Sequence, residues 1–142
     1  MEKYVFLVIF ILLLIHIGFS TTTIIQPNAT EGKDAYIRED FPNNNLGSAT
    51  TQYFGLTASG NKMRSLLFFN VSSIPSTDTI ISATLEIYVN NSGTGDSVTL
   101  EIYRITNNWV ESEVTWNQRT SSFSWASPGG DFTDLENSTT VS

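Results

Sequence analysis

The stretch TNNWVESEVTWNQR, residues 106–119, concentrates side chains that can do chemistry. Glu111 and Glu113 lie two positions apart, and an extended chain places such side chains on one face, about 7 Å from each other. Carboxylates about 5 to 10 Å apart could serve a glycosidase, and the neighbouring tryptophans could stack on sugar rings. The same residues could equally form a turn and a strand that aromatic side chains anchor in a core. Both interpretations stay open at this point.

The rest of the chain argues against catalysis. The single histidine, His16, lies in an apolar N-terminal segment, and the chain has no cysteine. A histidine base, a thiol nucleophile and a thiolate metal site are therefore excluded from the domain that follows. Around Glu111 and Glu113 we recognise neither a cleft nor the histidine or tyrosine partners of a hydrolase site. We expect a protein that is not an enzyme.

Residues 1–20 have the composition of a secretory signal peptide. Lys3 precedes an apolar run over residues 4–15, and Gly18 and Ser20 stand at positions −3 and −1 of a cleavage site. A membrane-spanning helix needs about 20 apolar residues, and this run is shorter; an uncleaved N-terminal anchor is the alternative. The sequence predicts a secreted, extracellular or cell-surface protein that meets the membrane only through this segment.

Removing the signal peptide leaves about 120 residues, enough for one domain with one hydrophobic core. Because the chain has no cysteine, no disulfide supports this domain, and the core must supply its stability. The net charge is −7 and no basic patch is present, so nucleic acid is not an expected partner. We expect a polar lead-in over residues 21–33 and a single module over residues 34–142. The sequence predicts no oligomeric state.

Short strands separated by turn residues make up this module. The clearest alternation of apolar and polar residues covers residues 80–90, IISATLEIYVN, and a polar connection leads to a second alternating run over residues 97–105. We expect these two runs to form an antiparallel hairpin. Residues 51–56 and 64–71 predict a second hairpin, and residues 34–39 predict a further strand.

No segment after residue 20 has a helical period, and β-branched and aromatic residues prevail over helix formers. The pattern predicts an all-β fold, an antiparallel two-sheet β-sandwich of jelly-roll type. The final residues 138–142, STTVS, look like the start of a strand without a successor. A sandwich that lacks its last strands exposes an edge, so we expect the module to be incomplete at its C-terminus.

Six motifs in the chain match, in order, those of one known family. They are DAYI from Asp34, NNNLGS from Asn43, RSLLFFNVSSIP from Arg64, SATLEIYV from Ser82, YRITNNWVESEVTWN from Tyr103 and GGDF from Gly129. Together they resemble the DNRLRE domain, also described as carbohydrate-binding module family 96, of exported bacterial and archaeal proteins. The resemblance implies a noncatalytic β-sandwich beside surface or polysaccharide-acting proteins, with some members linked to acidic glycans. It also implies that the domain continues for several more strands.

Four charged residues within these motifs could pair with one another. Arg64 and Arg104 could form ion pairs with Asp34 and Glu111, because a guanidinium donates two parallel hydrogen bonds to a carboxylate. The alternative is that Arg64 or Arg104 binds a carboxylate or sulfate group of a glycan. The net charge of −7 works against long-range attraction of such an anion.

The aromatic residues divide into expected core and expected ligand contacts. Tyr88 lies on the polar face of its predicted strand and Trp125 lies in a serine-rich loop, so these two are the expected sugar-stacking residues. Trp116, between β-prone residues, is expected to fill the core, and Trp109 to anchor a loop. The opening stretch is thus interpreted mainly as a signature of the fold.

Two further kinds of site are predicted. Calcium needs six to eight oxygen ligands. Asp34 and Asp131 are the candidate ligands of a structural calcium, because the glycines before Asp131 let backbone carbonyls approach a cation. No other cofactor is expected. Asn28 and Asn90 head Asn-x-Ser/Thr sequons in expected exposed segments and are the glycosylation candidates.

These observations lead to one expected function and one alternative. We expect an exported, noncatalytic module that binds polysaccharide, an acidic one included. The alternative is a structural or adhesive β-sandwich building block of a surface protein without a sugar site. Exposed aromatic side chains in a groove favour binding, and uniformly buried ones favour the structural role.

Overall fold

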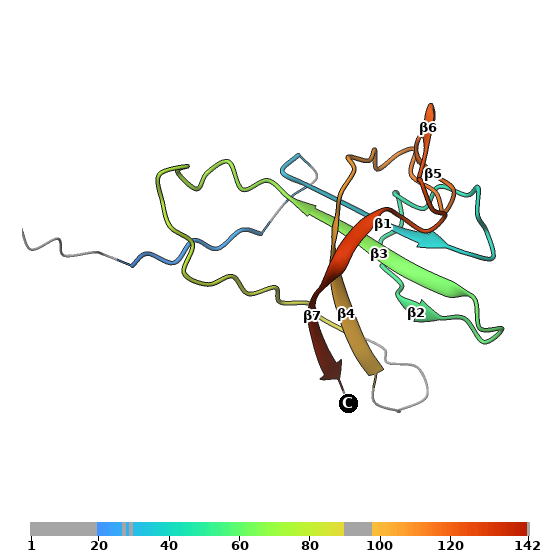
Figure 1. The fold of residues 1–142 in the computed structure, drawn as a ribbon, viewed down its shortest axis with the longest axis horizontal. Coiled ribbons are helices and arrows are strands. Elements are labelled where there is room, and N and C mark those ends of the chain that lie inside the picture. The colour runs from blue at the N-terminus through green and yellow to red at the C-terminus, as the bar shows by residue number, and fades with distance from the viewer. Residues whose placement is uncertain (1–19, 27, 29, 90–97, 142) are drawn as a thin grey trace, which may run out of the picture.

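A computed structural model describes residues 20–26, 28, 30–89 and 98–141 of the chain (Figure 1). These residues form antiparallel β-sheets and no helix, so the predicted all-β class is confirmed. Within the same ranges, accordingly, no helix is present that could cross a membrane. The predicted signal peptide lies, except for Ser20, outside the described residues.

The first sheet has three antiparallel strands in the order β1-β3-β2. β1 (Gly32–Arg38) pairs along its whole length with β3 (Lys62–Phe69), and β2 (Gly55–Leu56) adds a short strand at the other edge of β3. A turn closed by the Thr57 N–H donating to the Asn61 carbonyl, 2.8 Å, connects β2 to β3. The predicted hairpin of these two segments is confirmed, with a first strand of only two residues.

The second sheet pairs β4 (Val98–Ile105) with β7 (Phe132–Val141), antiparallel, and runs at a large angle to β1 and β3 in Figure 1. A third, very short sheet joins β5 (Gln118–Thr120) to β6 (Phe123–Ser124). The C-terminal strand was predicted to start near residue 138. It begins at Phe132 instead and finds β4 as its partner. The jelly-roll connectivity stays a prediction.

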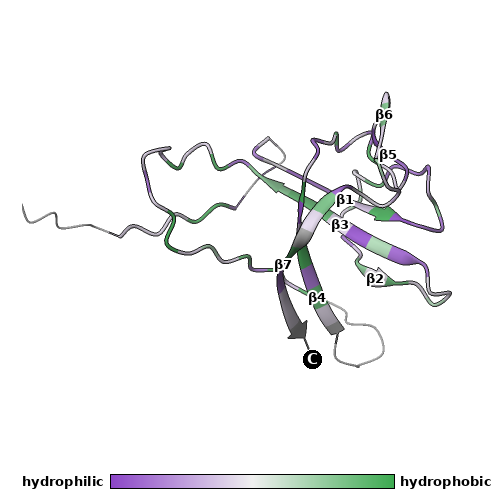
Figure 2. Ribbon diagram, in the orientation of Figure 1, coloured by the Kyte–Doolittle hydropathy of each residue, from purple (hydrophilic) through white to green (hydrophobic). Residues whose placement is uncertain are grey.

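The strand predicted over residues 80–90 is wrong for the described residues 80–89, which form no strand. β4 was expected to pair with this segment but pairs with β7, and the connection over residues 90–97 lies outside the described residues. Figure 2 shows that apolar residues recur along the segment before residue 90, yet Ile81 is 82% exposed. An alternating pattern forms a strand only where a sheet edge offers hydrogen bonds and a core accepts its apolar face. β4 pairs with β7 instead.

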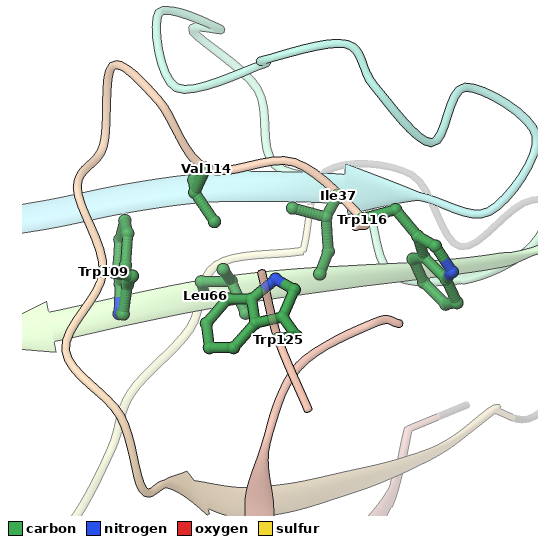
Figure 3. Close-up of a cluster of buried hydrophobic side chains, with 7 residues drawn as sticks. Ile37, Leu66, Trp109, Val114, Trp116 and Trp125 are labelled. Carbon is green, nitrogen blue, oxygen red and sulfur yellow. The ribbon is translucent and has the colours of Figure 1, made fainter. Parts of the chain in front are cut away.

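The core lies between the first sheet and the region of residues 106–131. Alternate residues of the paired strands β1 and β3 supply one side, and the 106–131 region supplies the other (Figure 3). The core cluster consists of Ala35, Ile37, Leu66, Trp109, Val114, Trp116 and Trp125. Trp116 is therefore buried as predicted, and Trp109, predicted to anchor a loop, is buried in the same cluster.

Candidate functional site

Asn45 fixes the loop that carries Glu111. Its side-chain Nδ2 donates to the carbonyl oxygens of Glu111, 2.7 Å, and Val114, 2.8 Å. Gly47 lies against the same loop, because a Cβ atom there would be 2.0 Å from the Glu111 carbonyl oxygen. The segment of Asn45 and Gly47 thus packs directly against the backbone of the Glu111 loop.

Lys33 of β1 reaches the same loop from the sheet. Its Nζ donates to the Trp109 carbonyl, 2.8 Å, and to Asn108 Oδ1, 3.2 Å. The ammonium also lies 4.7 Å from the ring centroid of Phe68 and 4.9 Å from that of Trp109. A cation over an aromatic face is attracted by the ring quadrupole. Lys33 thus joins β1, β3 and the loop at one point.

A groove of about 470 Å³ lies between the residues around Lys33 and the extended segment that contains Tyr88. We call it the Tyr88 groove. Tyr88 is 92% exposed, and Phe68 is a second exposed ring on its wall. The charged side chains of this groove are Lys33, Asp34, Glu86 and Glu111.

The combination of exposed rings and carboxylates suits a sugar. Aromatic faces pack against the apolar faces of sugar rings, and carboxylates accept strong hydrogen bonds from hydroxyl groups. A neighbouring hollow of about 550 Å³ shares Lys33 and Glu111 with the groove. Its aromatic side chain, Trp109, is buried and offers no free ring face. The Tyr88 groove is therefore the better candidate site.

Trp125 was predicted to share the sugar-stacking role of Tyr88, and this is wrong. Its side chain is only 4% exposed, and its Nε1 donates to the Thr115 carbonyl at 3.0 Å. The serine-rich sequence around it indicated exposure, but the backbone folds back, with the Trp125 N–H donating to the Asn117 carbonyl. Trp125 fills the core beside Leu66 (Figure 3). Tyr88 alone of the two is exposed as predicted.

The predicted ion pairs of the two arginines with Asp34 and Glu111 are not formed. Asp34 accepts a hydrogen bond from Gln52 Nε2, 2.6 Å, and the ion pair of Arg104 is with Glu136, 3.8 Å. Arg104 is largely exposed, and its side chain does not line the Tyr88 groove. Asp34, Arg64 and Arg104 thus each have another polar partner.

Arg64 packs against the turn of residues 126–131 and has a structural role there. Its Nη1 donates to the Gly129 carbonyl at 2.6 Å, and its guanidinium lies 5.1 Å from the Trp116 ring and 4.9 Å from the Phe132 ring. Burial lowers the pKa of Arg64 from its usual value, and the nearby Glu39 carboxylate opposes this in part. Gly129 has φ +95°, and a Cβ there would be 2.6 Å from Arg64 Nη1. Arg64 thus holds a turn and does not reach the Tyr88 groove.

Asp131, predicted as a calcium ligand, caps the same turn. Its carboxylate accepts hydrogen bonds from the backbone N–H groups of Ala126 and Ser127 and from the Asn107 amide. Burial alone would raise the pKa of Asp131, but these three hydrogen bonds hold the pKa below its usual value. Among the described residues, no group of three or more acidic or histidine side chains could hold a metal ion. A site built from Asp34, Asp131 and backbone carbonyls is not such a group, so structural calcium stays a prediction.

Of the two glycosylation candidates, Asn28 lies within the described residues and Asn90 does not. The Asn28 side-chain oxygen accepts hydrogen bonds from the Thr30 N–H and hydroxyl, 2.9 and 2.6 Å, and Asn28 lies at the rim of the Tyr88 groove. Glycosylation at either position stays a prediction.

The family model of carbohydrate-binding module family 96 matches residues 26–126 of the chain. The chain belongs to this family. The match contains every residue that lines the Tyr88 groove, from Asn28 to Glu111. Comparison with curated proteins and with solved structures gives no match. Membership of family 96 supports the predicted carbohydrate-binding module, with a carbohydrate as the partner.

Proposed function

We propose that this family 96 protein is an exported, noncatalytic module that binds polysaccharide in the Tyr88 groove, at or near the cell surface. The observation that carries the proposal is the 92% exposed ring of Tyr88 in a groove that also presents carboxylates. A ring so exposed contributes little to the core, whereas it offers a full face to a sugar.

The test is affinity electrophoresis of the purified protein through gels that contain single neutral or acidic polysaccharides. Retention on at least one of them is expected. Tyr88→Ala should reduce this retention about tenfold; a nucleic-acid base stacked on an aromatic side chain contributes roughly 1–3 kcal/mol, and we expect a sugar ring on Tyr88 to gain about as much. Tyr53→Ala is the matched control, because Tyr53 is half exposed and packs edge-on against Tyr36, away from the groove.

The outcomes separate the two candidate roles. A folded protein that no polysaccharide retains would exclude the binding role and favour a structural or adhesive building block. Retention that Tyr88→Ala leaves unchanged would remove the groove as the site while keeping the function.

The proposed export rests on residues 1–20, in which Lys3, an apolar run and small residues before Thr21 follow the order of a signal peptide. The expected mature N-terminus is Thr21. N-terminal sequencing of the protein recovered from an exporting host checks this. A protein that keeps residues 1–20 and stays with the membrane fraction would favour the anchor.

A further inference from the structure

Negative charge dominates the Tyr88 groove. Asp34, Glu86 and Glu111 line it, whereas Lys33 is the one cationic side chain among its described lining residues. Three carboxylates and one ammonium leave two net negative charges at the site. The whole chain carries −7, so the long-range field has the same sign as the local one.

The one ammonium is already engaged by the protein. Lys33 Nζ donates to the Trp109 carbonyl and to Asn108 Oδ1, and it lies over the rings of Phe68 and Trp109. An incoming carboxylate would compete with these four contacts for the ammonium, in a groove that Asp34 and Glu111 also line. Lys33 therefore holds the site together more than it attracts an anion.

The arginines do not change this balance. Arg64 is half-buried against Gly129, Trp116 and Phe132, and Arg104 lies close to Glu136. Neither side chain lines the Tyr88 groove. The cations that the sequence offered for an acidic glycan are thus placed elsewhere.

We propose that the Tyr88 groove selects neutral polysaccharides over polyuronates and sulfated glycans; this inference rests on the proposed function. The carboxylates of Glu86 and Glu111 accept hydrogen bonds from sugar hydroxyls, while Tyr88 and Phe68 contact a ring face. A glycan carboxylate in the same position meets like charges, which is unfavourable. Glu86 and Glu111 are therefore the specificity-determining residues.

The experiment uses pairs of polysaccharides that share a backbone and differ in charge. Hydroxyethyl cellulose and carboxymethyl cellulose form one pair, and methyl-esterified and de-esterified polygalacturonan form another. For any pair that is retained, the neutral member should bind at least about tenfold more tightly at low salt, given the cost of like charges. The ratio should fall as salt rises, because screening shortens the reach of the groove's charges.

The charge-neutral variant Glu86→Gln tests the cause. Glu86 is exposed, so the substitution removes a charge without opening the core. Glu86→Gln should lower the neutral-to-acidic affinity ratio about threefold or more, consistent with loss of one like-charge contact. Glu101→Gln is the matched control: Glu101 is an exposed acid on β4, outside the groove, and should leave the ratio unchanged.

Each outcome bears on one of the two claims. Equal or tighter binding of the acidic members, with or without added calcium, overturns the preference for neutral glycans while polysaccharide binding stands. A ratio that Glu86→Gln and Glu101→Gln change equally overturns the role of the groove carboxylates. A folded protein that retains neither member of any pair contradicts the proposed function itself.

Discussion

The 106–131 region and the segment of residues 80–89 carry similar amounts of apolar side chain but differ in what they do with it. In the first, three tryptophans are buried against the sheet. In the second, Ile81 and Tyr88 are exposed to 82% and 92%. The first region has little regular strand, whereas the second has the more regular sequence pattern.

The difference comes from polar side chains that bind backbone groups. Asn45, Thr115 and Asp131 each make two or more such hydrogen bonds that fix parts of the 106–131 region. The strand predicted over residues 80–90 needed a partner strand, and β4 pairs with β7 and not with its described residues 80–89. Specific polar contacts thus hold the apolar residues of the 106–131 region in the core. Residues 80–88 keep their apolar side chains exposed, and the proposed function uses one of them, Tyr88.

The largest loss of stability is expected for a substitution of Trp125. If Trp125 belonged to the binding surface instead of the core, the contrast between the 106–131 region and residues 80–89 would fail. Trp125→Ala should destabilise the fold by about 3–5 kcal/mol, because it empties a core site. Trp125→Phe keeps a ring and loses the hydrogen bond to Thr115, so a smaller loss is expected. Equilibrium denaturation in urea measures both. A stable Trp125→Ala protein that no longer binds polysaccharide would restore Trp125 to the sugar contacts.

Asn45 comes next, because it clamps the loop without adding to the core. Asn45→Ala leaves the carbonyl oxygens of Glu111 and Val114 without this donor, and a loss of about 2–3 kcal/mol is expected. Asn44→Ala is the matched control, since Asn44 is exposed and its hydrogen bond to Phe41 uses the backbone N–H. Thermal unfolding followed by tryptophan fluorescence compares them. Equal melting temperatures would show that the loop is held without Asn45.

A smaller, pH-dependent effect is expected from Asp131. Its pKa is lower in the folded state than its ordinary value, so its stabilising contribution is present above about pH 3.9 and is lost as the pH falls through the folded pKa. Asp131→Asn should therefore lower the unfolding midpoint at pH 7, and the difference from the parent protein should shrink below about pH 4. Denaturation series at several pH values measure this. A constant difference from pH 7 to pH 2 would remove the carboxylate charge as the cause.

Much of the first sheet could be predicted from the sequence, because its evidence is local. DAYIRE is the β-prone run that gives most of β1, and the turn before β3 is marked by Ser59, Gly60 and Asn61. The burial of Trp116 followed from its β-prone neighbours. Period and turn chemistry act over a few residues and remain readable in the sequence.

The remaining features depend on distant partners. Asn45 is 66 and 69 residues from the two carbonyl groups that it binds, and no spacing in the sequence connects them. β4 pairs with β7 and not with residues 80–89, and alternation alone does not identify the partner of a strand. The groove was missed because Lys33, Tyr88 and Glu111 come from three separate parts of the chain.

The smallest effect is expected at Ile81, and the sharpest form of the comparison sets it beside the same substitution in the core. Ile37 is fully buried and Ile81 is 82% exposed, so the same change from isoleucine to alanine meets two environments. Ile37→Ala should cost about 2–5 kcal/mol, whereas Ile81→Ala should stay within about 0.5 kcal/mol of the parent protein. Urea denaturation of both variants gives the two values. A loss of more than about 1 kcal/mol for Ile81→Ala would mean that residues 80–89 bury their apolar face as their alternation indicates. The wall of the Tyr88 groove would then be a strand of the core, and Tyr88 would no longer be free to meet a sugar.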